Sequence, residues 1–348
     1  MPGFESIIGQ DRPKRILTAF LQKRTWPHAL LFTGLKGVGK ESAAVAFAMA
    51  CNCAASRLAN NLKAHANRKT DRSEAAAPTS TGLPCGSCKS CRKIESNSHP
   101  DIIRIQPAGP FIKIDQIRTL CQTLAMKPYE ASVRVVIISD AQAMNPAAGN
   151  ALLKMLEEPP ERTILILLAP DTSDLLPTIM SRCQQIRFYP LSRRVLAAVL
   201  VNEDGVDARE AEIIAAMAGG SISRARQMHQ TDWINRRDWL ICESEAISVG
   251  PVNRLLAFGE QLSKDKESLP EALEVIKSWL RDLVVARFNS KNIINHDLTA
   301  KLQQTSQKMT LSSLLSKFEA IQSTQNAIKA GTNIRLAMES MILKLSRS

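Results

Sequence analysis

The sequence predicts an α/β P-loop domain with a parallel sheet, followed by two all-α domains. Short apolar strands alternate with helical segments up to about residue 189, and the strand signals stop after Pro190. Strands that alternate with helices form parallel sheets with helices on both faces. A chain of 348 residues is also too long for a single core. We therefore expect three domains, at residues 1–189, 190–235 and 236–348.

Five strands are expected in the first domain, each short and apolar on both sides, as buried parallel strands are. They are Ala29–Phe32, Asp101–Ile105, Val133–Ile138, Ile164–Ala169 and Gln185–Tyr189. The helical segments between them are Ala43–Ala50, Ile117–Met126, Ala147–Leu156 and the turn Leu175–Met180. Because proline cannot continue a helix, Pro159 and Pro160 must lie beyond the end of the Ala147 segment.

Only helical patterns follow Pro190. Three short helices are expected at Leu191–Val201, Ala208–Ala218 and Ser223–His229. Longer amphipathic segments come next, at Pro251–Leu262, Leu269–Phe288 and Leu311–Leu345. Residues 54–82 differ from the rest, because they are rich in Ala, Asn, Ser, Lys and Arg and contain no aromatic residue. This composition predicts a mobile insertion within the first domain.

The composition, with 45% apolar and 22% charged residues, indicates a soluble globular protein. No apolar run is long enough to span a bilayer, and the first ten residues carry no signal-peptide pattern. We therefore expect a cytoplasmic protein that does not contact membranes. The net charge of +12 favours contact with the phosphate backbone of DNA, although a solvated basic surface has the same charge.

A glycine-rich segment, Gly34–Lys40, fits the phosphate-loop template G-x-x-x-x-G-K and lies between a strand and a helix. Gly34, Gly37 and Gly39 allow the backbone N–H groups to face phosphates, and the helix N-terminus adds partial positive charge. Lys40 would contact the outer phosphates. The segment therefore predicts a nucleotide site of the ATP-binding type.

Two elements that hold Mg²⁺ in hydrolytic P-loop enzymes are altered. The template requires Ser or Thr after the lysine, but Glu41 stands there, and Ser42 is turned away by about 100°. The third strand should end with Asp followed by Glu, whereas it ends with Ser139 and Asp140. In an alternative register Asp140 is the metal ligand, and Ala141 takes the place of the Glu. In either register ATP binding would be weak or absent, and hydrolysis by this chain alone is not expected.

Three cysteines, Cys85, Cys88 and Cys91, have the spacing of a zinc knuckle. Tetrahedral Zn²⁺ needs a fourth soft ligand, and Cys51 and Cys53 are both candidates. Four thiolates with no open position would make the metal structural rather than catalytic. A redox pair or unligated thiols are the alternative interpretation. The other cysteines are expected to be buried: Cys121, Cys183 and Cys242.

Residues 8–190 contain an ordered set of motifs: Ile8–Gln10, His28–Phe32 with the P-loop, the cysteine knuckle, His99–Asp101, Asn150–Pro160 and Leu176–Cys183. Together they resemble the clamp loader subunits of bacterial DNA polymerase III, which belong to the AAA+ class, and among them the delta-prime type. The Asn150–Pro160 block and the triplet Ser181-Arg182-Cys183 are highly specific. The chain beyond residue 190 matches only in its helical character.

The resemblance implies roles for particular residues. In similar chains the fourth zinc ligand lies thirteen residues after the P-loop lysine, which is Cys53 here. The arginine of the Ser-Arg-Cys triplet reaches the ATP site of a neighbouring subunit, so Arg182 is expected to act in catalysis in trans. The alternative is that Arg182 only pairs with an acidic residue of its own surface. Hydrolysing relatives carry an arginine in the lid where this chain has Ser223, with Arg224 one position later.

The resemblance also implies the function and the partners. The chain would be a delta-prime subunit of the DNA polymerase III holoenzyme, in a hetero-oligomeric ring with delta and tau/gamma subunits. Such a ring uses ATP to load a sliding clamp onto primed DNA in replication. Residues 190–235 would form a lid, and residues 236–348 a collar that joins the subunits.

Three other interpretations are less favoured. An ATP-hydrolysing motor subunit of the tau/gamma type would need Ser or Thr at position 41 and an Asp-Glu pair at positions 139 and 140. A zinc-containing nucleic-acid-binding protein would need basic and aromatic residues around the knuckle; the basic residues Lys89, Arg92 and Lys93 are present, but no aromatic residue for base stacking. The altered metal ligands also disfavour an independent nucleotide-dependent enzyme.

Overall fold

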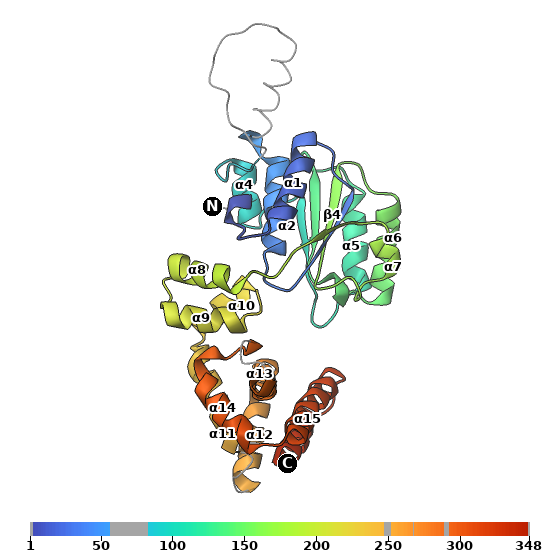
Figure 1. The fold of residues 1–348 in the computed structure, drawn as a ribbon. Helices are drawn as coiled ribbons and strands as arrows, with labels where there is room; N and C mark the ends of the chain where they lie inside the picture. Colours follow the sequence, from blue (N-terminus) through green and yellow to red (C-terminus); the bar gives the residue numbers. More distant parts are fainter. Residues whose placement is uncertain (1–2, 56–82, 247–251, 267, 289–291, 347–348) are drawn as a thin grey trace. The chain divides into compact units, whose positions relative to one another are not determined.

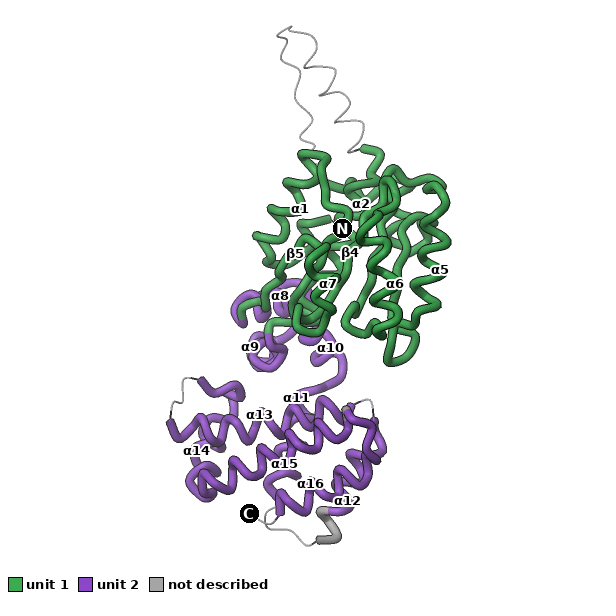
Figure 2. Tube along the Cα trace, turned by 90° about the vertical axis from the view of Figure 1, so that its right-hand side faces the viewer, with its two compact units in different colours: residues 1–192, 220–223 green, residues 193–219, 224–348 purple. Residues whose placement is uncertain are grey.

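The computed structural model describes residues 3–55, 83–246, 252–266, 268–288 and 292–346, which form two compact units. Unit 1 comprises residues 1–192 and 220–223, and unit 2 comprises residues 193–219 and 224–348 (Figure 2). The insertion predicted at 54–82 lies almost entirely outside the described residues. A separate domain boundary at residue 235 stays a prediction. In the described part of the chain, no helix has the length and apolar character needed to cross a membrane.

Unit 1 is built on a five-stranded parallel sheet with the strand order β2-β3-β4-β1-β5. Each pair of neighbouring strands is parallel, and Leu31 of β1 lies between Leu167 of β4 and Gln185 of β5. The predicted strands and the predicted parallel sheet are therefore confirmed. The strands are β1 (Ala29–Thr33), β2 (Ile102–Ile105), β3 (Arg134–Ile138), β4 (Thr163–Ala169) and β5 (Gln184–Arg187).

Helices cover both faces of the sheet, as buried parallel strands require (Figure 1). Alternate side chains of β3 face opposite ways: Val135 and Ile137 pack into one core, and Val136 and Ile138 into the other. The helices of the first core are α1 (Asp11–Lys23), α2 (Lys40–Asn52) and α4 (Lys89–Glu95). Those of the second core are α5 (Ile114–Leu124), α6 (Pro146–Glu157) and α7 (Pro177–Met180). Short 3₁₀ turns lie at Phe4–Ser6 (η1) and Ala141–Ala143 (η2).

After β5 the described part of the chain consists of helices and the loops between them, with no further strand. The short helices are α8 (Arg193–Asp204), α9 (Ala208–Met217) and α10 (Ile222–Gln230), of which the first two residues belong to unit 1. The longer part of unit 2 contains α11 (Trp233–Ala246), α12 (Val252–Lys264), α13 (Leu269–Phe288), η4 (His296–Leu298), α14 (Thr299–Lys308), α15 (Leu311–Lys329) and α16 (Ile334–Ser346). The predicted all-α character of this part is confirmed.

The segment expected at Leu311–Leu345 is two helices rather than one. Gly331 has a left-handed φ of 86°, which glycine adopts without steric penalty, and it follows the last turn of α15. The Thr332 N–H then donates to the Ala327 carbonyl, which closes a helix C-cap. Asn333 accepts the Leu336 N–H and so starts α16. One glycine and one capping asparagine therefore divide an otherwise continuous apolar pattern.

The prediction that Cys242 is buried is wrong. Cys242 is exposed on α11, whose buried face is formed by Trp233, Arg237, Leu240 and Ile241. One further residue along a helix turns the side chain by about 100°, which carries Cys242 off that face. Cys183 is buried as expected, and its burial raises the pKa of the thiol to about 12.

Asp101 of the His-Pro-Asp motif anchors the loop before β3 to the start of β2. It is 2% exposed, and its carboxylate accepts the N–H groups of Tyr129, Glu130 and Ala131 at 2.7–2.8 Å. The Arg134 guanidinium lies 3.6 Å away. Burial alone would raise the pKa of Asp101, but these hydrogen bonds and the arginine outweigh it and hold the pKa below its ordinary value.

Replacing Asp101 with Asn should lower the free energy of unfolding by about 2–3 kcal/mol at pH 7, because the amide cannot accept three N–H groups and balance the Arg134 charge. Since the folded pKa is lowered, this stabilisation is complete above the ordinary carboxyl value of 3.8 and decreases as the pH falls through the folded pKa. Urea unfolding of both proteins from pH 7 to pH 3 measures it. An equal loss at every pH would contradict the electrostatic origin, and the exposed Asp115→Asn is the control.

Candidate nucleotide site and cysteine cluster

The predicted phosphate loop connects the end of β1 with the start of α2. Gly39 is the N-cap of α2 and has a left-handed φ of 99°. Because glycine has no side chain, the N–H groups of the first turn are not capped by one. Lys40 folds back over the loop and donates to the carbonyl oxygens of Gly34 and Leu35. Burial, which outweighs the attraction of Asp140, lowers the pKa of Lys40 to about 8. The loop therefore combines a lysine with an open helix N-terminus.

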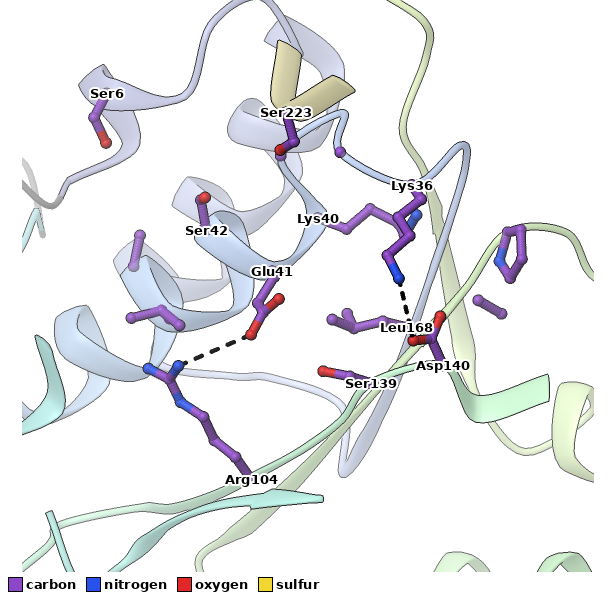
Figure 3. A pocket seen from close by; sticks show the side chains of 16 residues that line it. Ser6, Lys36, Lys40, Glu41, Ser42, Arg104, Ser139, Asp140, Leu168 and Ser223 are labelled. Atoms are coloured by element: carbon purple, nitrogen blue, oxygen red, sulfur yellow. Dashed lines mark ion pairs between the residues drawn. The ribbon is translucent and has the colours of Figure 1, made fainter. Parts of the chain in front are cut away.

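A cavity of about 510 Å³ lies beside this loop (Figure 3). Gly37, Gly39 and Lys40 line it, whereas Gly34 does not. The residues at the altered metal-holding positions line the same cavity, and they come from α2 and from the end of β3: Glu41, Ser139 and Asp140. Ser42, which was expected to be turned away from the metal position, also lines the cavity. The fold thus brings together predicted site residues that are about a hundred positions apart in the chain.

Each of the two carboxylates in the cavity is paired with a basic side chain. Arg104 of β2 approaches Glu41, with 3.9 Å between a guanidinium nitrogen and Oε1, and Lys36 of the loop lies 3.8 Å from Oδ2 of Asp140 (Figure 3). The sequence prediction did not include Arg104. A signal for it was present, since Ile-Ile-Arg-Ile places one charged residue within an apolar strand.

The segment at the start of α10 lies directly on the phosphate loop. The N–H groups of Ile222 and Ser223 lie 3.1 and 3.4 Å from the Gly37 carbonyl oxygen. A side chain on Gly37 would collide with Ser221 and Ser223, so the close approach requires glycine there. Ser223 lines the cavity.

Gln10 of the Ile-Gly-Gln motif ties three segments of unit 1 together. Its side-chain amide is buried, donates to the carbonyl oxygens of Val38 and Tyr189, and accepts the Tyr189 N–H. The backbone at Gln10 is left-handed, with φ of 59°. The motif therefore holds the phosphate loop against the segment after β5.

Arg182 follows α7 on the surface of unit 1 and is paired with Glu157 at the end of α6. The distance between a guanidinium nitrogen and Oε1 is 2.8 Å, and a second nitrogen donates to the Thr178 carbonyl oxygen at 3.0 Å. Its side chain is 36% exposed. Arg182 is therefore paired with an acidic residue of its own subunit's surface, which was the alternative interpretation of this arginine.

Four cysteines from two segments form a cluster. The Sγ atoms of Cys53, Cys85, Cys88 and Cys91 all lie within 4.8 Å of one another. Cys53 ends α2, and Cys88 is the N-cap of α4, where its sulfur accepts the Cys91 N–H at 3.5 Å. Two similar hydrogen bonds follow: the Cys85 N–H donates to the sulfur of Cys53, and the Cys88 N–H donates to the sulfur of Cys85. Such a group of thiols can hold a metal ion.

Cys51, the other candidate for the fourth ligand, does not belong to the cluster. Its side chain is 7% exposed and lies in the hydrophobic core on the α2 side of the sheet, and burial raises the pKa of its thiol. Burial also raises the pKa of Cys91. At Cys85, hydrogen bonds from Cys88 and Ser87 outweigh the effect of burial and lower the pKa to about 6.

Similarity to known proteins covers almost the whole chain. Two family models match, described as "DNA polymerase III, delta subunit" at residues 57–192 and "DNA polymerase III, delta subunit, C terminal" at residues 231–347. The DNA polymerase III subunit delta' of Bacillus subtilis is 28% identical over 97% of this chain and 96% of its own length. That of Pseudomonas aeruginosa is 34% identical over 58% of this chain and 56% of its own length.

The chain also matches the tau subunit of DNA polymerase III, but only part of it. In Bacillus subtilis the identity to tau is 30% over 80% of this chain and 46% of that protein. Among solved structures, a gamma-subunit-related protein of Thermotoga maritima matches with a TM-score of 0.36 and 17% identity, over 96% of this chain and 98% of that one. The near full-length match to delta' and the two family models together show that the chain belongs to the delta-prime family of DNA polymerase III clamp loader subunits.

Proposed function

We propose that this delta-prime subunit does not hydrolyse ATP at its own P-loop and that it supplies Arg182 to the ATP site of a neighbouring subunit. One observation carries the first half: the position directly after Lys40 is Glu41 rather than Ser or Thr, and both carboxylates of the cavity lie near basic side chains. P-loop hydrolysis depends on Mg²⁺ held by such groups and on an acidic or amide side chain that orients water. This chain lacks that combination.

The trans-acting role of Arg182 agrees with the energetics of its present contact. An exposed ion pair such as Arg182–Glu157 contributes at most about 1 kcal/mol. An arginine finger accelerates phosphoryl transfer by about 10³–10⁵-fold, which corresponds to roughly 4–7 kcal/mol of transition-state stabilisation. Exchange of Glu157 for the transferring phosphoryl group in the transition state would therefore be favourable, and the own-surface contact does not argue against the role.

The proposed partners follow from membership in the family. We infer that the chain assembles with delta and tau/gamma subunits in a ring that loads the sliding clamp onto primed DNA. In this assembly residues 190–235 would form the lid of an AAA+ module, and residues 236–348 the collar that joins the subunits. The net charge of +12 is consistent with DNA near the ring.

We propose further that the cysteine cluster holds a structural Zn²⁺ ion. A tetrahedral site with Zn–S bonds of about 2.3 Å needs sulfurs about 3.8 Å apart, and the four Sγ atoms already lie within 4.8 Å of one another. Four thiolates saturate the metal, so it would have no place for water or substrate. Its effect would be to cross-link the end of α2, through Cys53, to the knuckle Cys85–Cys91, which includes the first turn of α4.

The isolated chain should show no Mg²⁺-dependent ATPase activity above background. The reason is the altered metal site, and a sensitive phosphate-release assay at saturating ATP measures it. Lys40→Ala is the control for contaminating enzymes, because it removes the lysine of this P-loop and leaves a contaminant unaffected. Robust turnover that disappears in Lys40→Ala would overturn the proposal.

A further inference from the structure

We propose that the P-loop cavity binds a polyphosphate chain without Mg²⁺ and that Arg104 supplies the positive charge which the metal supplies in hydrolysing relatives. The proposal goes beyond the role of the chain in the clamp loader and does not depend on Arg182. It rests on the contents of one cavity in unit 1: the phosphate loop, three basic side chains and two carboxylates that are already paired.

A magnesium ion does not fit this cavity. Mg²⁺ demands near-octahedral oxygen ligands at 2.0–2.1 Å and is normally held by a P-loop hydroxyl and an acidic side chain. Here the hydroxyl position carries Glu41, which is engaged by Arg104, and the end of β3 offers Ser139 and an Asp140 that is engaged by Lys36. A metal ion at either carboxylate would therefore lie next to a positively charged side chain, which disfavours it.

Arg104, in contrast, is placed to contact phosphate oxygens. It projects from β2 into the cavity toward the first turn of α2, as Figure 3 shows. One terminal guanidinium nitrogen, Nη2, donates to the Ile94 carbonyl oxygen at 3.5 Å, and the other, Nη1, lies 3.9 Å from Oε1 of Glu41. The guanidinium group is planar, always charged and suited to contact with phosphate. A phosphate oxygen beside Glu41 could therefore accept a hydrogen bond from Nη1.

The charges of the cavity favour the metal-free ligand. Lys36, Lys40 and Arg104 outnumber Glu41 and Asp140 by one, before the partial positive charge of the α2 N-terminus is added. ATP without its metal carries more negative charge than Mg²⁺-ATP and is attracted more strongly.

Equilibrium titration calorimetry of the full chain tests the proposal, with ATP and with inorganic tripolyphosphate, each in EDTA and in excess Mg²⁺. We expect binding in EDTA to be at least as tight as in Mg²⁺ for at least one ligand. Tighter binding of ATP would identify a nucleotide as the ligand, and equal binding would identify the phosphate chain alone. Binding that requires Mg²⁺, or no binding of either compound in EDTA, would overturn the proposal.

Variants of the two paired residues should change the affinity in opposite directions. Arg104→Gln should weaken binding in EDTA by about tenfold or more, since a charge-assisted hydrogen bond is lost. Glu41→Gln should strengthen it several-fold, because a negative charge leaves the cavity; a folding defect could not produce this gain. Arg118→Gln, on the exposed face of α5, is the matched control and should change nothing. Unchanged affinity in both Arg104→Gln and Glu41→Gln would exclude the assigned role of Arg104.

Discussion

Replacing Arg182 with Ala should slow ATP hydrolysis at one site of the reconstituted clamp loader by about 10³-fold or more. The affected site is the one on the subunit that contacts this face, because the guanidinium group would no longer stabilise charge on the transferring γ-phosphate. Single-turnover hydrolysis by the assembled loader measures it. The burst should lose the amplitude of one site while the remaining sites react at their usual rate.

Two further variants distinguish this role from a structural one. Glu157→Gln breaks the 2.8 Å pair with Arg182 but keeps the arginine, so hydrolysis should be unchanged or faster. Arg118→Ala removes another surface arginine, from α5, that is also paired with a carboxylate, and should have no effect. An unaltered loader rate in Arg182→Ala would remove the trans-acting role. A loss in Glu157→Gln equal to that in Arg182→Ala would assign the effect to the pair instead.

Replacing Cys53 with Ser should abolish metal binding, whereas Cys51→Ser should leave the metal content near one equivalent. The sulfur of Cys53 belongs to the group of four that lie within 4.8 Å of one another, whereas Cys51 packs in the hydrophobic core beneath α2. Because the free energy of binding structural zinc is coupled to folding, the loss of the metal should lower the free energy of unfolding by more than about 3 kcal/mol. Elemental analysis and urea unfolding of the purified variants measure both quantities.

The comparison of the two serine variants also guards against a general folding effect. Cys51→Ser places a hydroxyl among apolar side chains and should cost about 1–3 kcal/mol without loss of metal. Addition of a strong chelator should destabilise wild-type protein and Cys51→Ser, but not Cys53→Ser. Full metal content in Cys53→Ser would refute the assignment, and a chelator effect in that variant would do the same.

Local patterns predicted much of unit 1, because short apolar strands and phosphate-loop glycines are properties of neighbouring residues. The predicted ends of the five strands differ from the observed ends by at most two residues. Helix α1 was missed although Pro13, Leu17 and Leu21 follow a helical spacing, because charged residues dominate its first turn. Helix α4 is only seven residues long, too short for a periodic pattern to be evident.

The sequence by itself determined the parallel α/β unit, the all-α remainder, the P-loop with its altered metal positions, and the knuckle of Cys85, Cys88 and Cys91. Each of these depends on residue type and short-range spacing. The spacing of the cysteines left Cys51 and Cys53 open, the resemblance implied Cys53, and the structure brings Cys53 to the knuckle. Only the tertiary structure decided that Arg104 faces Glu41 and that Cys242 is exposed. These outcomes depend on how separate segments pack against one another, and no local pattern carries that information.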